Sequence, residues 1–498
     1  MHFVAITEGT TADKVPIGQK LGYGLGSLLD MWGHWLYPTL AYQVFNIFLG
    51  VSPAVVARAL FISRLFDAAS DPIFGWLSDN TRTRFGRRRP YILLGSILAG
   101  IGLPMLFFIA PGWSEMGYFW FMVGSSAIFV PVMSCFNMPY QSLGAELTPD
   151  YHERTSVFAV RNAIQKIPEV AMFYAAQFTT LAVWTAYPNA GLLGRAKRLF
   201  TSTAAWSPAA NEKPNILLGA QVYCAILGTF MIMAGIAMFA LVRERYYDTL
   251  AVRQERIAFA ETLWKTLKCR PFRLELIMVL AYAIGLSMVG TLGYYDTVYY
   301  VCKGNVALGA QWNFYMGIAG MLLGLVGIPV YASVAHRFGK VRAMMTVLLT
   351  AVVVFVSTWW IYNPNVPWLQ PLASAFIAFT AAGFWMLDGS IGADVIDYDE
   401  IQTGKRREGA FSACKSWITK VGMALGALTS GEILARTGFD AKVGPAQTEH
   451  SLFMIRFFLA FIPVVGLSLA AIAMSRFPLT PSKMTEIRRE LEARRGIV

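Results

Sequence analysis

Long apolar runs constrain this chain more than any other feature. About twelve of them are long enough to cross the ~30 Å hydrocarbon core of a bilayer, for which an α-helix needs about 20 residues. A segment inside lipid must satisfy its own backbone hydrogen bonds, so each run is predicted to be a helix. We therefore predict an all-α membrane protein. The runs cover 21–49, 55–77, 91–110, 118–143, 156–183, 216–242, 274–300, 308–334, 343–362, 372–395, 409–434 and 452–474.

The composition supports this fold class and argues against others. Hydrophobic residues make up 56% of the 498 residues and charged residues only 14%, whereas soluble proteins carry about 25% charged residues. The formal net charge is +12, but the basic residues lie mostly in short loops between apolar runs. Such loops set orientation in the membrane, so we expect no nucleic-acid partner. The five cysteines form no CxxC pair, which argues against a disulfide framework or a metal site.

A basic stretch divides the chain into two groups of about six runs each. Two short motifs recur at matching places, because Arg84–Arg87 (RFGR) follows the second run and Arg337–Lys340 (RFGK) follows the eighth. Two six-helix halves in parallel repeat are typical of the major facilitator fold, in which the solute binds between the halves. We predict an N-terminal half at 1–242, a cytoplasmic linker at 243–273, a C-terminal half at 274–476 and a cytoplasmic tail at 477–498.

The distribution of Lys and Arg predicts the orientation. Loops after the second, eighth and tenth runs are rich in Arg or in both Lys and Arg, whereas the segments 50–53, 111–117 and 363–371 carry neither. Because basic loops stay inside, we expect both termini in the cytoplasm of a cell bounded by a bacterial inner membrane. The loop 184–215, with four basic residues on the predicted outer side, is an exception. We expect a monomer with membrane lipids around it.

The second run carries charges that a plain membrane helix would avoid. Asp67 and Asp71 are four residues apart and so lie on one helix face, with Arg64 close by. Two carboxylates this close repel, so either one keeps a proton or a cation lies between them. A structural pair neutralised by Arg64 would leave one carboxylate uncompensated. We therefore predict a binding site for a coupling ion, Na⁺ or H⁺, and no other cofactor.

The first run presents a second polar face. Asp30, His34 and Tyr37 follow one another at helical spacing, with two tryptophans nearby. A carboxylate beside aromatic rings suits a hydroxylated solute, although the aromatic residues alone also fit an interfacial belt. His34 fits either a donor or acceptor on this face or a packing residue, and the sequence leaves its role open.

Charged residues in later runs complete the candidates. Lys420 lies too deep in the eleventh run to reach the surface easily, and Arg161 lies in the fifth. In the tenth run Trp385 and Asp388 are deep, while an acidic cluster at its inner end faces the basic residues 405–407. This cluster is predicted to be an ionic latch between the halves, with Asp394, Asp397 and Arg406 as its main members. Asp296 is a candidate to line or gate the cavity.

Three motifs resemble the glycoside–pentoside–hexuronide:cation symporters, the group of the major facilitator superfamily that includes melibiose permease. They are Arg64–Trp76 (RLFDAASDPIFGW), Pro139–Leu143 (PYQSL), and Ala393–Tyr398 (ADVIDY) followed by Glu408-Gly409 and Lys420. The resemblance covers nearly the whole chain. It implies alternating-access symport of a sugar or glycoside with Na⁺ or H⁺.

The resemblance also implies site residues. The cation site of the family falls on Asp67, Ser70, Asp71 and Ser134. Its sugar site falls on Asp30, Tyr37, Asn137, Gln141, Arg161, Trp385 and Lys420.

Two departures bear on the substrate. Melibiose permease has an acid at the position of Asn137 and a tryptophan at that of Gln141, so recognition of an α-galactoside is in question. Ser70 replaces an amide of the Na⁺-using pattern, which gives weight to H⁺.

Other functions remain open at this point. A carrier of lysolipid or another polar solute on the same scaffold is the first alternative. A membrane enzyme is more remote, because the chain has no HExxH, GxSxG or P-loop motif. A sensor that does not transport is the third.

Overall fold

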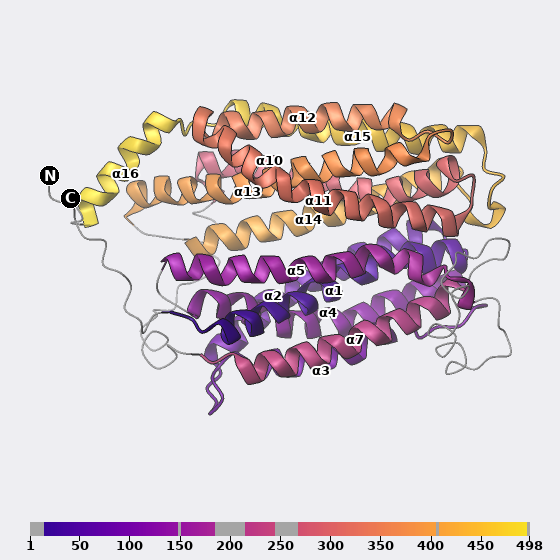
Figure 1. Ribbon diagram of the computed structural model, residues 1–498, viewed down its shortest axis with the longest axis horizontal. Helices are drawn as coiled ribbons and strands as arrows, with labels where there is room; N and C mark the ends of the chain where they lie inside the picture. The colour runs from indigo at the N-terminus through magenta and orange to yellow at the C-terminus, as the bar shows by residue number, and fades with distance from the viewer. Residues whose placement is uncertain (1–13, 148–150, 185–214, 245–266, 405–407, 496–498) are drawn as a thin grey trace. The chain divides into compact units, whose positions relative to one another are not determined.

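The computed structural model describes residues 14–147, 151–184, 215–244, 267–404 and 408–495. Within these residues twelve long α-helices are followed by a shorter one, and each predicted apolar run is covered by one long helix (Figure 1). The prediction of an all-α membrane protein is confirmed. The helices are α1 (Ile17–Ala41), α2 (Pro53–Asn80), α3 (Arg89–Met105), α4 (Glu115–Glu146), α5 (Tyr151–Thr179), α7 (Ile216–Leu241), α10 (Arg270–Tyr295), α11 (Val306–Phe338), α12 (Lys340–Ile361), α13 (Gln370–Thr403), α14 (Glu408–Arg436), α15 (Glu449–Ser475) and α16 (Pro481–Arg495).

Seven of the described helical segments are long and apolar enough to cross a membrane by length and composition. They correspond to α4, α7, α10, α11, α12, α13 and α15. Helices α1, α2, α5 and α14 do not meet these criteria, and they carry Asp30, Asp67, Arg161 and Lys420. Helix α3 is apolar but shorter. The protein is therefore an integral, multi-pass membrane protein in which several spans contain charges.

The first compact unit comprises 1–49 and 65–255. In it α1 packs on α5 and α7, and α3 packs on α4 and α7. Glycines make these approaches close, as is common between membrane helices. A Cβ atom on Gly100 of α3 would lie 2.5 Å from the carbonyl oxygen of Gly228 on α7. A Cβ atom on Gly95 would lie 2.7 Å from the backbone nitrogen of Phe136 on α4.

The second compact unit comprises 50–64 and 256–498. In it α10 packs on α14 and α15, α13 packs on α11 and α12, and α16 packs on α13. Its buried core includes a parallel stack between the rings of Tyr282 and Phe384, whose centroids are 3.6 Å apart. This packing holds the polar faces of α10, α13 and α14 in fixed positions.

The two units contain matching local structures. Gly86 in the RFGR motif has φ +102° and Gly339 in the RFGK motif has φ +88°, the left-handed region that favours glycine. Each motif leads into a helix, α3 in one unit and α12 in the other. Helices α1 and α10 each continue as a π-helix, η2 (Tyr42–Phe48) and η5 (Asp296–Val301). The sequence repeat therefore has a counterpart in backbone geometry. The loop 184–215 and the predicted linker 243–273 fall largely outside the described residues.

Candidate functional site

A carboxylate and a guanidinium meet inside the first unit. Oδ2 of Asp30 on α1 accepts a hydrogen bond from Nη2 of Arg161 on α5 at 2.9 Å. The Nε of Arg161 also donates to the hydroxyl of Tyr140 on α4 at 3.0 Å. Tyr140 is fully buried, whereas Asp30 and Arg161 keep about a fifth of their side chains exposed, 22% and 19%. The pair is thus held by three helices and remains accessible.

His34 connects this pair to two amides. Its Nδ1 lies 3.0 Å from the backbone oxygen of Asp30, and its Nε2 lies 3.4 Å from Nδ2 of Asn137. Gln141 donates from Nε2 to Oδ1 of Asn137 at 3.0 Å. The neutral imidazole with its proton on Nδ1 satisfies both contacts, because that nitrogen then donates and Nε2 accepts. One continuous network therefore runs from Gln141 through His34 to Asp30.

Glycines on α1 and α4 allow these helices to approach each other. A Cβ atom on Gly26 would overlap the ring of Tyr140, and one on Gly33 would overlap the side chain of Met133. On α4, a Cβ atom on Gly144 would overlap the hydroxyl of Tyr23. The close approach brings the polar side chains of two helices within hydrogen-bonding distance.

The four residues predicted to bind the cation lie on two helices of the same unit. Ser134 on α4 donates to Oδ1 of Asp71 on α2 at 2.8 Å, and its oxygen lies 2.7 Å from Oγ of Ser70. Ser70 also lies one turn from Asp67, with Oγ 3.4 Å from the backbone oxygen of that residue. Asp67 is 2% exposed. The structure thus brings two hydroxyls together with the carboxylate of Asp71, and Asp67 lies one turn away on the same helix. Such oxygen atoms are ligands of the kind that hard cations prefer. Within the described residues no three His, Cys, Asp or Glu side chains gather in a metal-binding group.

Other predicted residues lie elsewhere. Tyr37 is buried and packs against Phe107, with ring centroids 5.5 Å apart, rather than in the polar network. In the second unit Trp385 packs edge-on against Tyr282 at 5.8 Å, and Lys420 on α14 is half-buried. Asp296 is 1% exposed, and neither of its carboxylate oxygens has a hydrogen-bond partner among the described residues.

One of the predicted latch residues, Asp394, has a partner within the second unit. Nζ of Lys340, from the RFGK motif, lies 2.8 and 2.7 Å from the two carboxylate oxygens of Asp394. Asp397 is half-buried on the same helix. Arg406 lies outside the described residues.

Sequence reasoning missed two charged residues of the second unit. Lys415 on α14 contacts Glu275 on α10 and also Asp388, whose role was unassigned. Both missed residues lie within a few positions of the predicted inner end of a run, where charged side chains ordinarily reach the membrane surface. The structure buries Glu275 instead, at 1% exposure.

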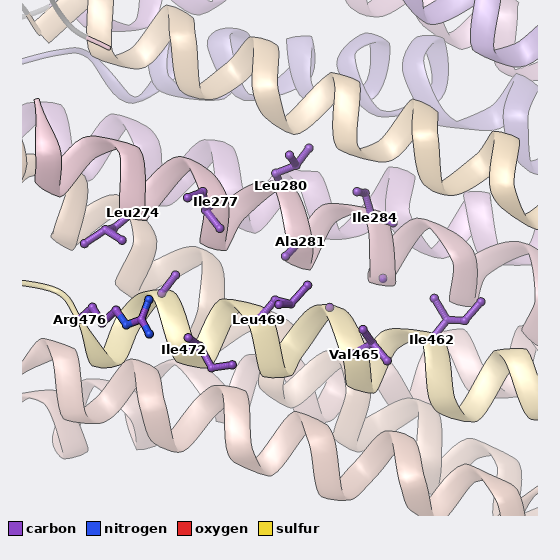
Figure 2. Close-up of a pocket in the computed structure, with 13 residues that line it drawn as sticks. Leu274, Ile277, Leu280, Ala281, Ile284, Ile462, Val465, Leu469, Ile472 and Arg476 are labelled. Atoms are coloured by element: carbon purple, nitrogen blue, oxygen red, sulfur yellow. The ribbon is translucent and has the colours of Figure 1, made fainter. Parts of the chain in front are cut away.

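An apolar groove of about 490 Å³ lies between α10 and α15. Figure 2 shows Leu274, Ile277 and Ile284 from one helix, with Val465 and Leu469 from the other, and the guanidinium of Arg476 at one end. This lining offers no carboxylate or amide side chain. The groove therefore lacks the groups that would recognise a polar solute. The network around Asp30 provides such groups.

The chain that contains this polar network and these buried carboxylates matches a family model. The model described as MFS/sugar transport protein covers residues 22–481. The chain belongs to this family. The transporter therefore has the major facilitator fold, and the resemblance to glycoside–pentoside–hexuronide:cation symporters is confirmed.

Relatives of the transporter are transporters or symporters by name. It is 26% identical to the isoprimeverose transporter of Lactiplantibacillus pentosus, over 93% of this chain and 88% of that one. It is 24% identical to the putative glycoside/cation symporter YagG of Escherichia coli, over 96% and 95%. It is 23% identical to the sodium-dependent lysophosphatidylcholine symporter 1 of Mus musculus, over 89% and 82%.

A solved structure supports the fold independently. The inward-facing bacterial homologue of the lysosomal transporter Spinster superposes with a TM-score of 0.64 at 14% sequence identity, over 93% of this chain and 98% of that one. At this identity the likeness concerns the fold alone.

Proposed function

We propose that this transporter moves a sugar or glycoside together with a monovalent cation, Na⁺ or H⁺, by alternating access. Family membership supports a transport function, and the names of the bacterial relatives support a glycoside as the solute. The cation is assigned to Asp67, Ser70, Asp71 and Ser134. The solute is assigned to the network of Asp30, Asn137, Gln141 and Arg161, and on motif alone to Tyr37, Trp385 and Lys420.

The position of α4 carries this proposal. Ser134 belongs to the cation group and Asn137 to the solute network, and the two are three residues apart on one helix. Residues at this spacing are neighbours on the helix surface. A cation that fixes the Ser134 hydroxyl therefore acts one helical turn from an amide that contacts the solute. This is the direct physical route for coupling that the first unit offers.

The coupling follows from charge and from linkage. Without a bound cation the carboxylates of Asp67 and Asp71 repel each other, and this repulsion disfavours the arrangement that binds solute. If the cation stabilises the arrangement that binds solute, the solute must raise cation affinity by the same factor. The membrane potential then supplies ~2.3 kcal/mol per charge for each 100 mV.

The proposed setting is the inner membrane of a bacterium, with the transporter as a monomer and both termini cytoplasmic. The support is the asymmetry of Lys and Arg between loops. The division into two halves at 1–242 and 274–476, with the tail 477–498 in the cytoplasm, belongs to the same proposal. Asp394, Asp397 and Arg406 are proposed to latch the inner side.

Solute-dependent tryptophan fluorescence of the purified protein tests the proposal. The panel contains pentosides, hexosides, hexuronides and lysophosphatidylcholine, each with and without Na⁺ at two pH values. We expect a fluorescence response to a glycoside, and we expect Na⁺ or acid to strengthen this response. In Asp67→Asn the response should no longer depend on the cation. Lys483→Gln on α16, which removes an exposed ion pair with Glu486, is the control and should leave the response intact.

Two outcomes would overturn the substrate assignment. A response to the lysolipid and to none of the glycosides would favour a lipid carrier, as the name of the mouse relative suggests for that protein. A glycoside response that neither Na⁺ nor pH alters would remove the coupling while leaving the transporter fold.

A further inference from the structure

The second unit contains a charged triad that the proposed coupling does not use. Nζ of Lys415 on α14 lies 3.1 Å from Oε1 of Glu275 on α10 and 2.9 Å from Oδ2 of Asp388 on α13. It also lies 3.3 Å from the backbone oxygen of Asp388. Each member comes from a different helix, so the triad forms only when the second unit is packed.

The charges of the triad do not balance. Two carboxylates face one ammonium, which leaves one negative charge in excess. Glu275 is 1% exposed and Asp388 is 3% exposed, and both belong to candidate membrane spans. An uncompensated charge on carboxylates buried this deeply is costly. A buried cluster of this kind usually binds one further positive charge.

Carboxylate oxygen atoms without a hydrogen-bond partner indicate where the further positive charge binds. Oε2 of Glu275 and Oδ1 of Asp388 are buried and accept no hydrogen bond from any described residue. A buried carboxylate oxygen without a donor is costly, whereas a protonated one no longer carries the charge. Each carboxylate therefore has one oxygen on Lys415 and one that is suited to hold a proton.

Other charged groups on the surrounding helices do not resolve the imbalance. These include Arg270 and Arg273 on α10, Lys420 on α14, Asp394 on α13 with its partner Lys340 on α12, and Arg476 at the end of α15. The charges that act on Glu275 are those of Lys415 and Asp388, and those that act on Lys415 are the two carboxylates. Within the described part of the chain, the triad is thus electrostatically self-contained.

A glycine makes room for the triad. A Cβ atom on Gly392 of α13 would lie 2.9 Å from Oε1 of Glu275 and 3.0 Å from Nζ of Lys415. Any other residue there would press on the ends of both side chains. The ammonium already occupies the space between the carboxylates, which leaves a proton rather than a multiply coordinated Na⁺ as the ion that fits.

We infer that Glu275 and Asp388 share one exchangeable proton beside Lys415, which makes the triad a proton-binding site separate from the cation group on α2 and α4. The inference rests on the proposed function only for the use that transport makes of this proton. Binding of the proton is a property of the second unit and is measurable without any solute.

Infrared difference spectroscopy of the full-length protein in lipid nanodiscs tests the inference. Protonated carboxylic acids have a carbonyl band that carboxylates lack, and its intensity is followed as pH is raised. We expect the wild type to lose a band equivalent to one proton, and Glu275→Gln and Asp388→Asn each to lack that titrating band. Lys415→Gln should gain a second protonated carboxyl, because no ammonium then stabilises either carboxylate. Glu432→Gln, on the same helix as Lys415, is the control and should keep the wild-type titration.

Contrary results are readily distinguished. A titrating band that persists at full intensity in both Glu275→Gln and Asp388→Asn would overturn the inference, provided thermal melting shows both variants folded. So would a band that added Na⁺ removes at constant pH, since the site would then bind a metal cation. A wild-type protein that titrates as expected but responds to no glycoside would refute the proposed function and leave the proton site standing.

Discussion

Asp30 and Arg161 are 131 residues apart in the sequence, and their side chains meet at 2.9 Å in the first unit. Arg161 also donates to Tyr140, so the guanidinium is fixed on two sides. A solute hydroxyl that approaches this pair meets an acceptor and a donor whose positions are already set. Such preorganisation reduces the entropy that binding costs.

Asp30→Asn should weaken solute binding by about tenfold or more, because it leaves Arg161 with an uncompensated charge. Arg161→Lys keeps the charge but loses the contact with Tyr140 or with Asp30, and we expect a smaller loss. Binding is measured by solute-dependent fluorescence. Equal affinities for wild type and Asp30→Asn would place the solute elsewhere.

Ser134→Ala should lower the apparent affinity for the coupling cation by about tenfold, the equivalent of one hydrogen bond to a charged group. The substitution removes the hydroxyl that connects Ser70 to Asp71 through hydrogen bonds. The measurement is the concentration of Na⁺ or H⁺ that gives half of the solute response. Ser142→Ala serves as the control, because Ser142 bonds to the backbone of its own helix at Met138. An unchanged midpoint in Ser134→Ala would contradict the assignment.

Gly392→Ala should separate Lys415 from Glu275 and alter the proton titration of the triad, while the transporter remains folded. The new methyl group would need the ends of both side chains to shift by tenths of an ångström. Gly389→Ala lies one turn earlier on α13 and meets nothing within 4 Å, which makes it a matched control. Infrared titration and thermal melting are compared for both. If the two alanine variants titrate alike, the close fit at Gly392 has no functional consequence.

Glu244→Gln should destabilise the first unit by about 1 kcal/mol, the usual contribution of a helix cap. Its carboxylate accepts hydrogen bonds from the backbone nitrogens of Arg87, Arg88 and Arg89 at 3.0, 2.8 and 3.1 Å, at the start of α3. A negative charge there also interacts favourably with the helix dipole. Thermal melting in detergent measures the effect. Glu449→Gln, in the exposed first turn of α15, should have a smaller one, and the reverse order would refute the capping role.

The fold was predictable because every segment that spans the bilayer must satisfy its own backbone hydrogen bonds, which a helix does. Twelve apolar runs gave twelve helices, including those of α2, α5 and α14, in which charges lower the hydropathy. The RFGR and RFGK motifs were recognisable as a repeat because glycine at a positive φ leaves a trace in sequence. The π-helical ends of α1 and α10 left no such trace, since their residues include no glycine or proline and continue the apolar runs.

The candidate site was predictable in part. Asp30, Asn137, Gln141 and Arg161 do lie in one hydrogen-bonded network, but the residue that joins them is His34, whose role the sequence left open. Tyr140 was contained in a motif without being singled out, because a tyrosine there fits simple packing equally well. Glu275 and Lys415 were missed for a different reason. Their distance from the membrane surface depends on how the helices pack, and periodicity along one helix carries no information on that.

The π-helices η2 and η5 have a consequence for insertions and deletions. Inside an ordinary α-helix, removing one residue rotates everything beyond it by about 100°, which would turn a polar face toward lipid. A π-helix holds one residue more per turn than its neighbours require. Loss of a single residue within 42–48 or 296–301 would let the segment rewind as an α-helix and keep the faces on either side in register. The ends of α1 and α10 are therefore places where this chain can change length within a span and still fold.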